Sequence, residues 1–243
     1  MTTKGHFTEP TTDYWQRFVH EEELPEGVRS GDGPWRYGYP ARLPDGRFLV
    51  LPIRQVAADQ ALAVASLISN HASLEVVEAL GEMLARFLAP YSPEVVVGMP
   101  TLGLAFAPVV AKELRLERIV PLGYSRKYWY EEALSATVRS ITAPDDAKRV
   151  YLDPNLAPLL RGRRVVLVDD VVSSGTTLDL PWRLVESVGA EVLACGVVMR
   201  QGDRWARTLG PDRAAKVVGV FDTPLFTAVP DGWVRRGLSG EVT

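Results

Sequence analysis

Short apolar runs that alternate with helical segments restrict the fold of this chain more than any other feature. The runs are continuous in Val, Ile and Leu, which is typical of strands buried on both faces of a sheet. Strands that alternate with helices indicate βαβ units and a parallel sheet. We therefore predict an α/β fold with a mainly parallel five-stranded sheet flanked by helices. The expected strands are residues 95–99, 119–122, 165–168, 192–199 and 217–221, and the expected helices between them are 104–114 and 177–188.

The N-terminal part of the chain begins with a polar arm and a hairpin pattern. Pro44-Asp45-Gly46 separates two strand-like runs, residues 36–42 and 47–53, and this turn sequence predicts a β-hairpin. We expect an arm-and-hairpin unit over residues 1–55 and a main domain over residues 56–243.

Three further helices are expected before the first buried strand. Residues 56–70 have a helical pattern, and residues 74–89 place their apolar side chains on one face. Ser73 is a suitable N-cap for the second of these helices. A short helix is also expected within the arm, near residues 14–19.

An acidic pair and a small-residue loop follow the most apolar run. Asp169 and Asp170 come directly after it, and the loop then leads into a helix. Open parallel sheets bind ligands outside the carboxyl ends of their strands, and a helix N-terminus attracts anions. The loop predicts a phosphate site, and the carboxylates suit the vicinal hydroxyls of a ribose. For Asp169 alone a helix cap is the simpler interpretation. The loop residues are Ser173, Ser174, Gly175, Thr176 and Thr177.

The run from Val165 to Thr177 resembles the signature of type I phosphoribosyltransferases at every position. The resemblance implies that residues 173–177 hold the 5-phosphate of phosphoribosyl diphosphate (PRPP). It also implies that Asp169 and Asp170 orient the ribose and contact Mg²⁺ indirectly, through the ribose or water. The layout is closest to the adenine-type purine enzymes. The loop differs from the Thr-Gly-Gly-Thr usual in those enzymes, so the acceptor base stays open.

Two further segments match parts of this family. Thr101, Leu102 and Gly103 stand where the family has its diphosphate-binding loop. Arg126 and Lys127 lie in a polar, aromatic stretch, residues 123–155, which resembles the family's mobile catalytic loop. Positive charge there would stabilise the departing diphosphate. The alternative for Arg126 and Lys127 is a solvated basic spot.

Recognition of the base is the least specified part of the site. In this family a variable hood contacts the base, and here the N-terminal hairpin and the C-terminal tail would form it. Val171, Val172 and Phe226 are the candidate base-binding residues. A hydrophobic plug is an equally good interpretation of Phe226.

Several classes of protein are excluded by composition and motifs. The net charge of −3 and the lack of a basic face argue against nucleic acid, and no apolar run is long enough for a membrane span or a signal peptide. The single cysteine, Cys195, lies in an expected buried strand, and a cytoplasmic location fits. Only 73 residues follow Asp170, which is too few for a receiver domain. The three histidines have no metal-binding spacing.

These observations predict an enzyme that transfers 5-phosphoribosyl from PRPP to a nitrogenous base, with a purine as the expected acceptor. The products are a nucleoside monophosphate and diphosphate, with Mg²⁺ as cofactor, and the family implies a homodimer. A second hypothesis is a regulator that senses PRPP or a nucleotide without transferase activity. A hydrolase or ligase built on the same site is a third.

Overall fold

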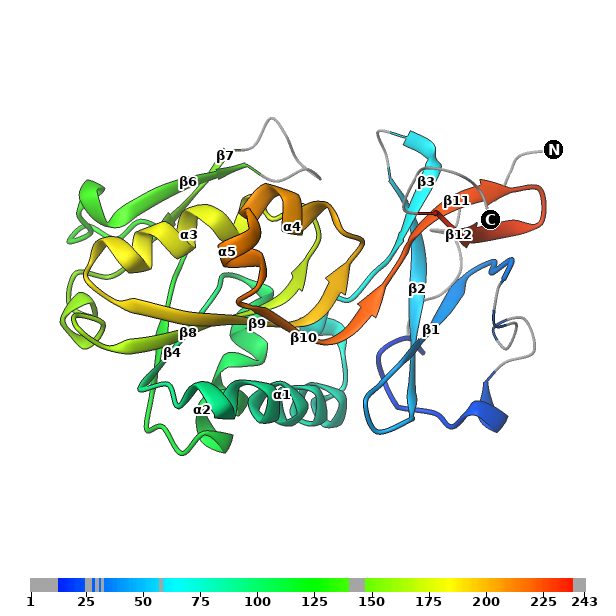
Figure 1. Cartoon of the computed structure of the whole chain (residues 1–243), viewed down its shortest axis with the longest axis horizontal. Helices are drawn as coiled ribbons and strands as arrows, with labels where there is room; N and C mark the ends of the chain where they lie inside the picture. Colours follow the sequence, from blue (N-terminus) through cyan, green and yellow to red (C-terminus); the bar gives the residue numbers. More distant parts are fainter. Residues whose placement is uncertain are drawn as a thin grey trace. The chain divides into compact units, whose positions relative to one another are not determined.

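The computed structural model describes residues 13–24, 28, 31, 33–56, 59–139 and 147–237 (Figure 1). The chain forms two compact units, one of Met1–Val76 with Phe221–Thr243 and the other of Val77–Val220. We call these the first and the second unit. This division differs from the predicted boundary after residue 55, because residues 59–65 are a strand of the first unit's sheet.

The second unit is built on a five-stranded sheet with the order β10-β9-β8-β4-β5. The pairs β4–β5, β4–β8 and β8–β9 are all parallel, which confirms the predicted α/β fold. Strand β8 continues to Val172, so the acidic pair lies inside the strand and not after it. The strands are β4 (Val95–Gly98), β5 (Ile119–Pro121), β8 (Arg164–Val172), β9 (Glu191–Gln201) and β10 (Val217–Thr223).

The order of the strands creates a switch point between β4 and β8. From β4 the chain moves to β5 on one side, and it later returns to β8 on the other side of β4. In open α/β sheets this is the place where ligands bind, at the carboxyl ends of the strands. The last pair of the β4–β8 ladder is Gly98 with Val168. The connections that begin at residues 99 and 173 therefore leave from adjacent strands.

Helices cover both faces of this sheet. Figure 1 shows α1 and α2 along one face and α3, α4 and α5 along the other. The predicted cap of α1 is confirmed, since the Val76 N–H donates to Ser73 Oγ at 3.2 Å. The helices are α1 (Leu74–Leu88), α2 (Ala107–Glu113), α3 (Thr176–Ser187), α4 (Arg204–Leu209) and α5 (Pro211–Ala214), with 3₁₀ turns at Glu21–Glu23, Ser69–His71, Ala89–Tyr91, Leu102–Ala105, Glu132–Leu134 and Ala157–Leu159.

The segment between β5 and β8 carries a hairpin of its own. Strands β6 (Ser135–Arg139) and β7 (Ala147–Tyr151) pair antiparallel, and β6 packs near α3. Gly123 and Tyr151 exchange two backbone hydrogen bonds, of 3.1 and 2.8 Å, at the base of the hairpin. Part of the predicted mobile loop 123–155 is thus ordered as strands, and residues 140–146 lie outside the described residues.

The first unit contains an antiparallel sheet with the order β1-β2-β3-β11-β12. The predicted hairpin is confirmed as β1 and β2, and the C-terminal tail supplies the last two strands. The bounds are β1 (Gly38–Arg42), β2 (Phe48–Val56), β3 (Asp59–Ala65), β11 (Leu225–Val229) and β12 (Gly232–Arg235).

Two predicted helices of this unit are wrong. Residues 59–65, within the expected helix 56–70, form β3, where Ala63 and Ala65 are buried and Leu62 and Val64 are half-buried. This period of two suits a strand, and pairing with β2 and β11 overrides the helix propensity of alanine. Near residues 14–19 the chain turns, and Val19 forms a β-bridge with Phe48.

No helix among the described residues is long and apolar enough to cross a membrane.

Candidate functional site

The acidic pair lies at the switch point and is largely buried. Asp169 is 9% exposed, Asp170 is half-buried, and the Asp170 N–H donates to Asp169 Oδ1 at 2.9 Å. Burial raises the pKa of Asp170 to about 6. Burial and the neighbouring Asp170 charge raise the pKa of Asp169 well above its usual range. Two carboxylates held this close favour a ligand that brings hydroxyl donors or positive charge.

The loop after β4 packs directly on the acidic pair. The Met99 N–H donates to the Val168 carbonyl oxygen at 2.9 Å, which extends the ladder past Gly98. A Cβ on Gly103 would lie 2.6 Å from that carbonyl oxygen and 2.7 Å from the Cα of Asp169. Only glycine permits this approach. Thr101 is exposed, Leu102 is half-buried, and the peptide bond between Pro100 and Thr101 is cis. The structure thus brings together the predicted diphosphate loop and the predicted ribose-binding residues.

The loop after β8 ends at the N-terminus of α3, as a phosphate cradle requires. Gly175 has a φ of +82°, a conformation that other residues adopt only with strain, and it precedes the first residue of the helix. Ser174 Oγ and Thr176 Oγ1 are hydrogen-bonded at 2.7 Å. Ser173 Oγ donates to Gln201 Oε1 at 3.0 Å. Thr176 and Thr177 are the first two residues of α3, so their hydroxyls and the backbone N–H groups of the helix N-terminus lie at the end of this loop.

The basic residues of the third segment, Arg126 and Lys127, are exposed, and Arg126 has a partner within that segment. Arg126 lies 4.0 Å from Glu132, and Glu132 also forms an ion pair with Arg149. Nearby, the Trp129 indole N–H donates to Asp153 at 3.3 Å, and Lys127 is exposed. The long contact between the exposed side chains of Arg126 and Glu132 is a weak surface ion pair, so it leaves Arg126 donors for an anion.

Two residues near the site were missed by the sequence analysis: Tyr124 and Gln201. Burial, together with the charges of Asp169 and Asp170, raises the pKa of Tyr124, so this half-buried phenol lies in the field of the acidic pair. Tyr124 closely follows β5, and Gln201 ends β9. The rule that carboxyl ends of parallel strands carry ligands could have found these two.

The predicted base-binding residues need a correction. Val172 is 1% exposed and belongs to the apolar core of the second unit. Phe226 is 0% exposed, and its ring packs edge-on against Trp35 at 5.8 Å and Tyr39 at 5.2 Å in the first unit. Neither side chain offers a surface to a base, so Phe226 is a hydrophobic plug. Val171 is half-buried and stays a prediction.

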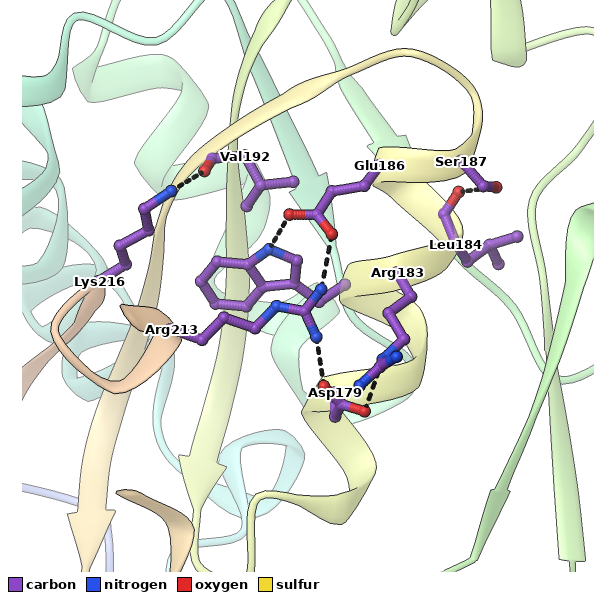
Figure 2. A network of polar contacts seen from close by, with 9 residues as sticks. Asp179, Arg183, Leu184, Glu186, Ser187, Val192, Arg213 and Lys216 are labelled. Atoms are coloured by element: carbon purple, nitrogen blue, oxygen red, sulfur yellow. Dashed lines mark hydrogen bonds and ion pairs between the residues drawn. The ribbon is translucent and has the colours of Figure 1, made fainter. Parts of the chain in front are cut away.

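An ion-pair network supports α3 from its first turn to its last (Figure 2). Arg213, on α5, donates to Asp179 and, at 2.6 Å, to Glu186, both of which lie on α3. Its guanidinium lies 5.5 Å from the ring centre of Trp182, whose indole N–H donates to Glu186 at 2.9 Å. This network joins α5 to the helix that begins at the phosphate loop.

We expect Arg213→Ala to lower the free energy of unfolding by roughly 2–3 kcal/mol, because it removes the cation that Asp179 and Glu186 share beside Trp182 and leaves Asp179 with only the exposed Arg183. Arg183 is the matched control, since it contacts the same Asp179 at 2.9 Å but is 65% exposed. Arg183→Ala should cost less than about 1 kcal/mol. Urea unfolding of both variants measures the difference, and equal losses would show that the network contributes no more than a surface ion pair.

Comparison with known proteins agrees with this geometry. Residues 64–228 match the model of the phosphoribosyl transferase domain. The chain therefore belongs to the phosphoribosyltransferase family, and the resemblance to its type I members is confirmed.

Individual relatives are purine phosphoribosyltransferases. The chain is 36% identical to the adenine phosphoribosyltransferase of Nitrosococcus oceani over 102 residues, which cover 42% of this chain and 56% of that protein. It is 26% identical to the xanthine phosphoribosyltransferase of an Exiguobacterium species over 164 residues, 66% of this chain and 81% of that one. The chain thus spans little more than half the length of the first of these.

A solved structure shows the same fold. It is APRTase from Giardia lamblia complexed with 9-deazaadenine, with a TM-score of 0.58, 17% identity and coverage of 71% of this chain and 93% of that one. At this identity the likeness supports the fold alone.

Proposed function

We propose that this protein transfers 5-phosphoribosyl from PRPP to a purine base, as a cytoplasmic homodimer. The observation that supports this most is the contact of Gly103 with Val168 and Asp169, which joins a diphosphate loop to a ribose-binding acidic pair. The phosphate loop at residues 173–177 continues from the same strand. The three parts of PRPP therefore have three adjoining sites in the order phosphate, ribose, diphosphate.

In the proposed reaction, the bond between ribose C1 and the diphosphate oxygen breaks, and its electron pair leaves with diphosphate. The lone pair of a base nitrogen forms the new C1–N bond, and the proton of that nitrogen passes to solvent. Asp169 and Asp170 accept hydrogen bonds from the ribose hydroxyls and stabilise positive charge at C1. Residues 101–103 hold the diphosphate, and positioning supplies much of the rate.

The residues present fit a divalent cation that is shared with the substrate. Within the described part of the chain, no three Asp, Glu, His or Cys side chains form a metal site. The buried pair of carboxylates, whose pKa values are raised by burial, would gain from a nearby positive charge. Mg²⁺ would neutralise the diphosphate as it leaves. Asp169 and Asp170 would contact it through water or through the ribose hydroxyls.

The acceptor is proposed as a purine because the relatives named above are adenine and xanthine enzymes. The test is diphosphate release from PRPP and Mg²⁺ with a panel of adenine, xanthine, hypoxanthine, guanine, uracil and orotate. Release that depends on one purine supports the proposal. Tight PRPP binding with no release on any base would favour the sensing hypothesis instead, and base-independent release would indicate a hydrolase.

We expect Arg126→Ala combined with Lys127→Ala to lower turnover about 10- to 100-fold. The loop supplies positive charge at the place where the departing diphosphate gains negative charge. Binding of ribose 5-phosphate should change less than twofold. Arg163→Ala is the control, since Arg163 pairs with Glu94 at 2.7 Å at the opposite end of the sheet. Equal losses of turnover and of ribose 5-phosphate binding would mean that the segment is only structural.

A further inference from the structure

The last residue of β9, Gln201, contacts the proposed phosphate loop from behind. The last pair of residues in the β8–β9 ladder is Val172 with Arg200. Ser173 and Gln201 each follow one member of that pair, so they lie side by side at the ends of the two strands. Gln201 is only 6% exposed. The Ser173 hydroxyl donates to its Oε1 at 3.0 Å. A buried amide in this position fixes the side-chain torsion of the serine.

The segment after Gln201 makes the back of this loop rigid. The Trp205 indole N–H donates to the Gly202 carbonyl oxygen at 3.0 Å, which ties α4 to the end of β9. A Cβ on Gly175 would lie 2.9 Å from the Trp205 carbonyl oxygen and 3.1 Å from Thr208 Cβ. The phosphate loop is therefore packed closely on the backbone of α4.

A glutamine suits both states of Ser173. A serine hydroxyl has one proton and two lone pairs, whereas an amide offers both an acceptor oxygen and a donor nitrogen. In this structure the proton of Ser173 is directed to Gln201. A phosphate oxygen accepts hydrogen bonds only, so Ser173 must turn its proton forward when phosphate binds. If the Gln201 amide rotates by half a turn, its Nε2 donates to Ser173 Oγ and keeps the serine satisfied.

We propose that Gln201 is a positioning residue that acts through Ser173 to hold the 5-phosphate of the substrate. This inference rests on the proposed function and adds to it a residue outside the signature run. Glutamate would accept from Ser173 permanently and repel a phosphate, and leucine would leave the hydroxyl without its partner.

The experiment measures the calorimetric affinity of the full chain for two probes, ribose 5-phosphate and inorganic diphosphate, the second with Mg²⁺. We expect Gln201→Leu to weaken ribose 5-phosphate binding about 5- to 20-fold, the value of one or two hydrogen bonds, and to leave diphosphate binding unchanged. Gln201→Glu should weaken ribose 5-phosphate binding more than Gln201→Leu does. Ser187→Ala is the control, since its hydroxyl donates to Leu184 at 2.8 Å near the other end of α3.

A double-mutant cycle with Ser173→Ala tests the route through Ser173. The double variant should bind ribose 5-phosphate no more weakly than the worse single variant, whereas additive losses would overturn that route.

Equal loss of binding of both probes in Gln201→Leu would show a structural role for Gln201 and overturn the proposal. If Gln201→Leu does not fold, the near-isosteric Gln201→Glu is used instead, and its binding of ribose 5-phosphate is compared with its binding of diphosphate. Unchanged binding in the variants refutes the inference, but failure of the wild type to bind ribose 5-phosphate refutes the proposed function itself.

Discussion

Asp170→Asn is expected to lower turnover at least about 100-fold while the protein stays folded. The amide keeps the shape of the side chain but loses the negative charge that stabilises the ribosyl centre, and electrostatic groups of this kind contribute factors of about 10² to 10³. Steady-state release of diphosphate measures the loss. Asp212→Asn is the control, since this carboxylate is exposed on α5 and belongs to none of the segments assigned to the site. Wild-type activity in Asp170→Asn would refute the assignment of the acidic pair.

The same variant should change how stability depends on pH. Burial raises the pKa of Asp170 from 3.8 to about 6, so its protonated form is favoured in the folded state. The stability that this gives is present below about pH 4 and is lost as the pH rises through about 6. The amide of the variant cannot ionise. The unfolding free energy of Asp170→Asn relative to wild type should therefore increase by up to roughly 3 kcal/mol between about pH 4 and pH 7. A difference that does not vary with pH would contradict the raised pKa.

Gly103→Ala is expected to weaken diphosphate binding by about 5- to 150-fold. The new Cβ would lie 2.6 Å from the Val168 carbonyl oxygen and 2.7 Å from Asp169 Cα, and both are backbone atoms that cannot turn away. The loop must move off β8, and overpacking of this kind costs about 1–3 kcal/mol. Calorimetry with diphosphate and Mg²⁺ measures the loss.

Gly123→Ala is the matched control for this substitution. Gly123 lies in the same unit, a Cβ added to it would meet no atom within 4 Å, and its φ is not positive, so alanine fits there. The diphosphate affinity of this variant should stay within about twofold of wild type. If Gly103→Ala behaves like Gly123→Ala, the loop does not need its close approach to the acidic pair, and the site as described is wrong.

The second unit was predictable because its signals are local. Continuous apolar runs such as Val165–Val168 mark strands buried on both faces, and the small residues at 173–177 mark the turn into α3. The fold of the first unit was harder to predict from the sequence. β3 is held by its pairing with β2 and β11, and β11 lies more than 150 residues further along the chain. No local pattern encodes a pairing of that separation, so an alanine-rich segment was expected to be helical.

The candidate site also depends on long-range contacts that no local sequence pattern encodes. The acidic pair and both loops were predicted from residue type and position, since each was expected to follow an apolar run, although the acidic pair lies inside β8. Their mutual contact depends on strand order, which places β4 beside β8. Its residue type and its place in the C-terminal tail left Phe226 equally open to base binding and to a role as a hydrophobic plug, and only the tertiary packing against Trp35 and Tyr39 shows that it is buried. Gln201 has no motif around it, and its role follows from a single contact across two strands.

The most direct test of the central claim is the product balance with PRPP, Mg²⁺ and the purine that gives release. We predict one nucleoside monophosphate for each diphosphate formed, and loss of both products together in Asp170→Asn. Formation of free ribose 5-phosphate with diphosphate, or no product from PRPP under any purine, would contradict a phosphoribosyl transfer at this site.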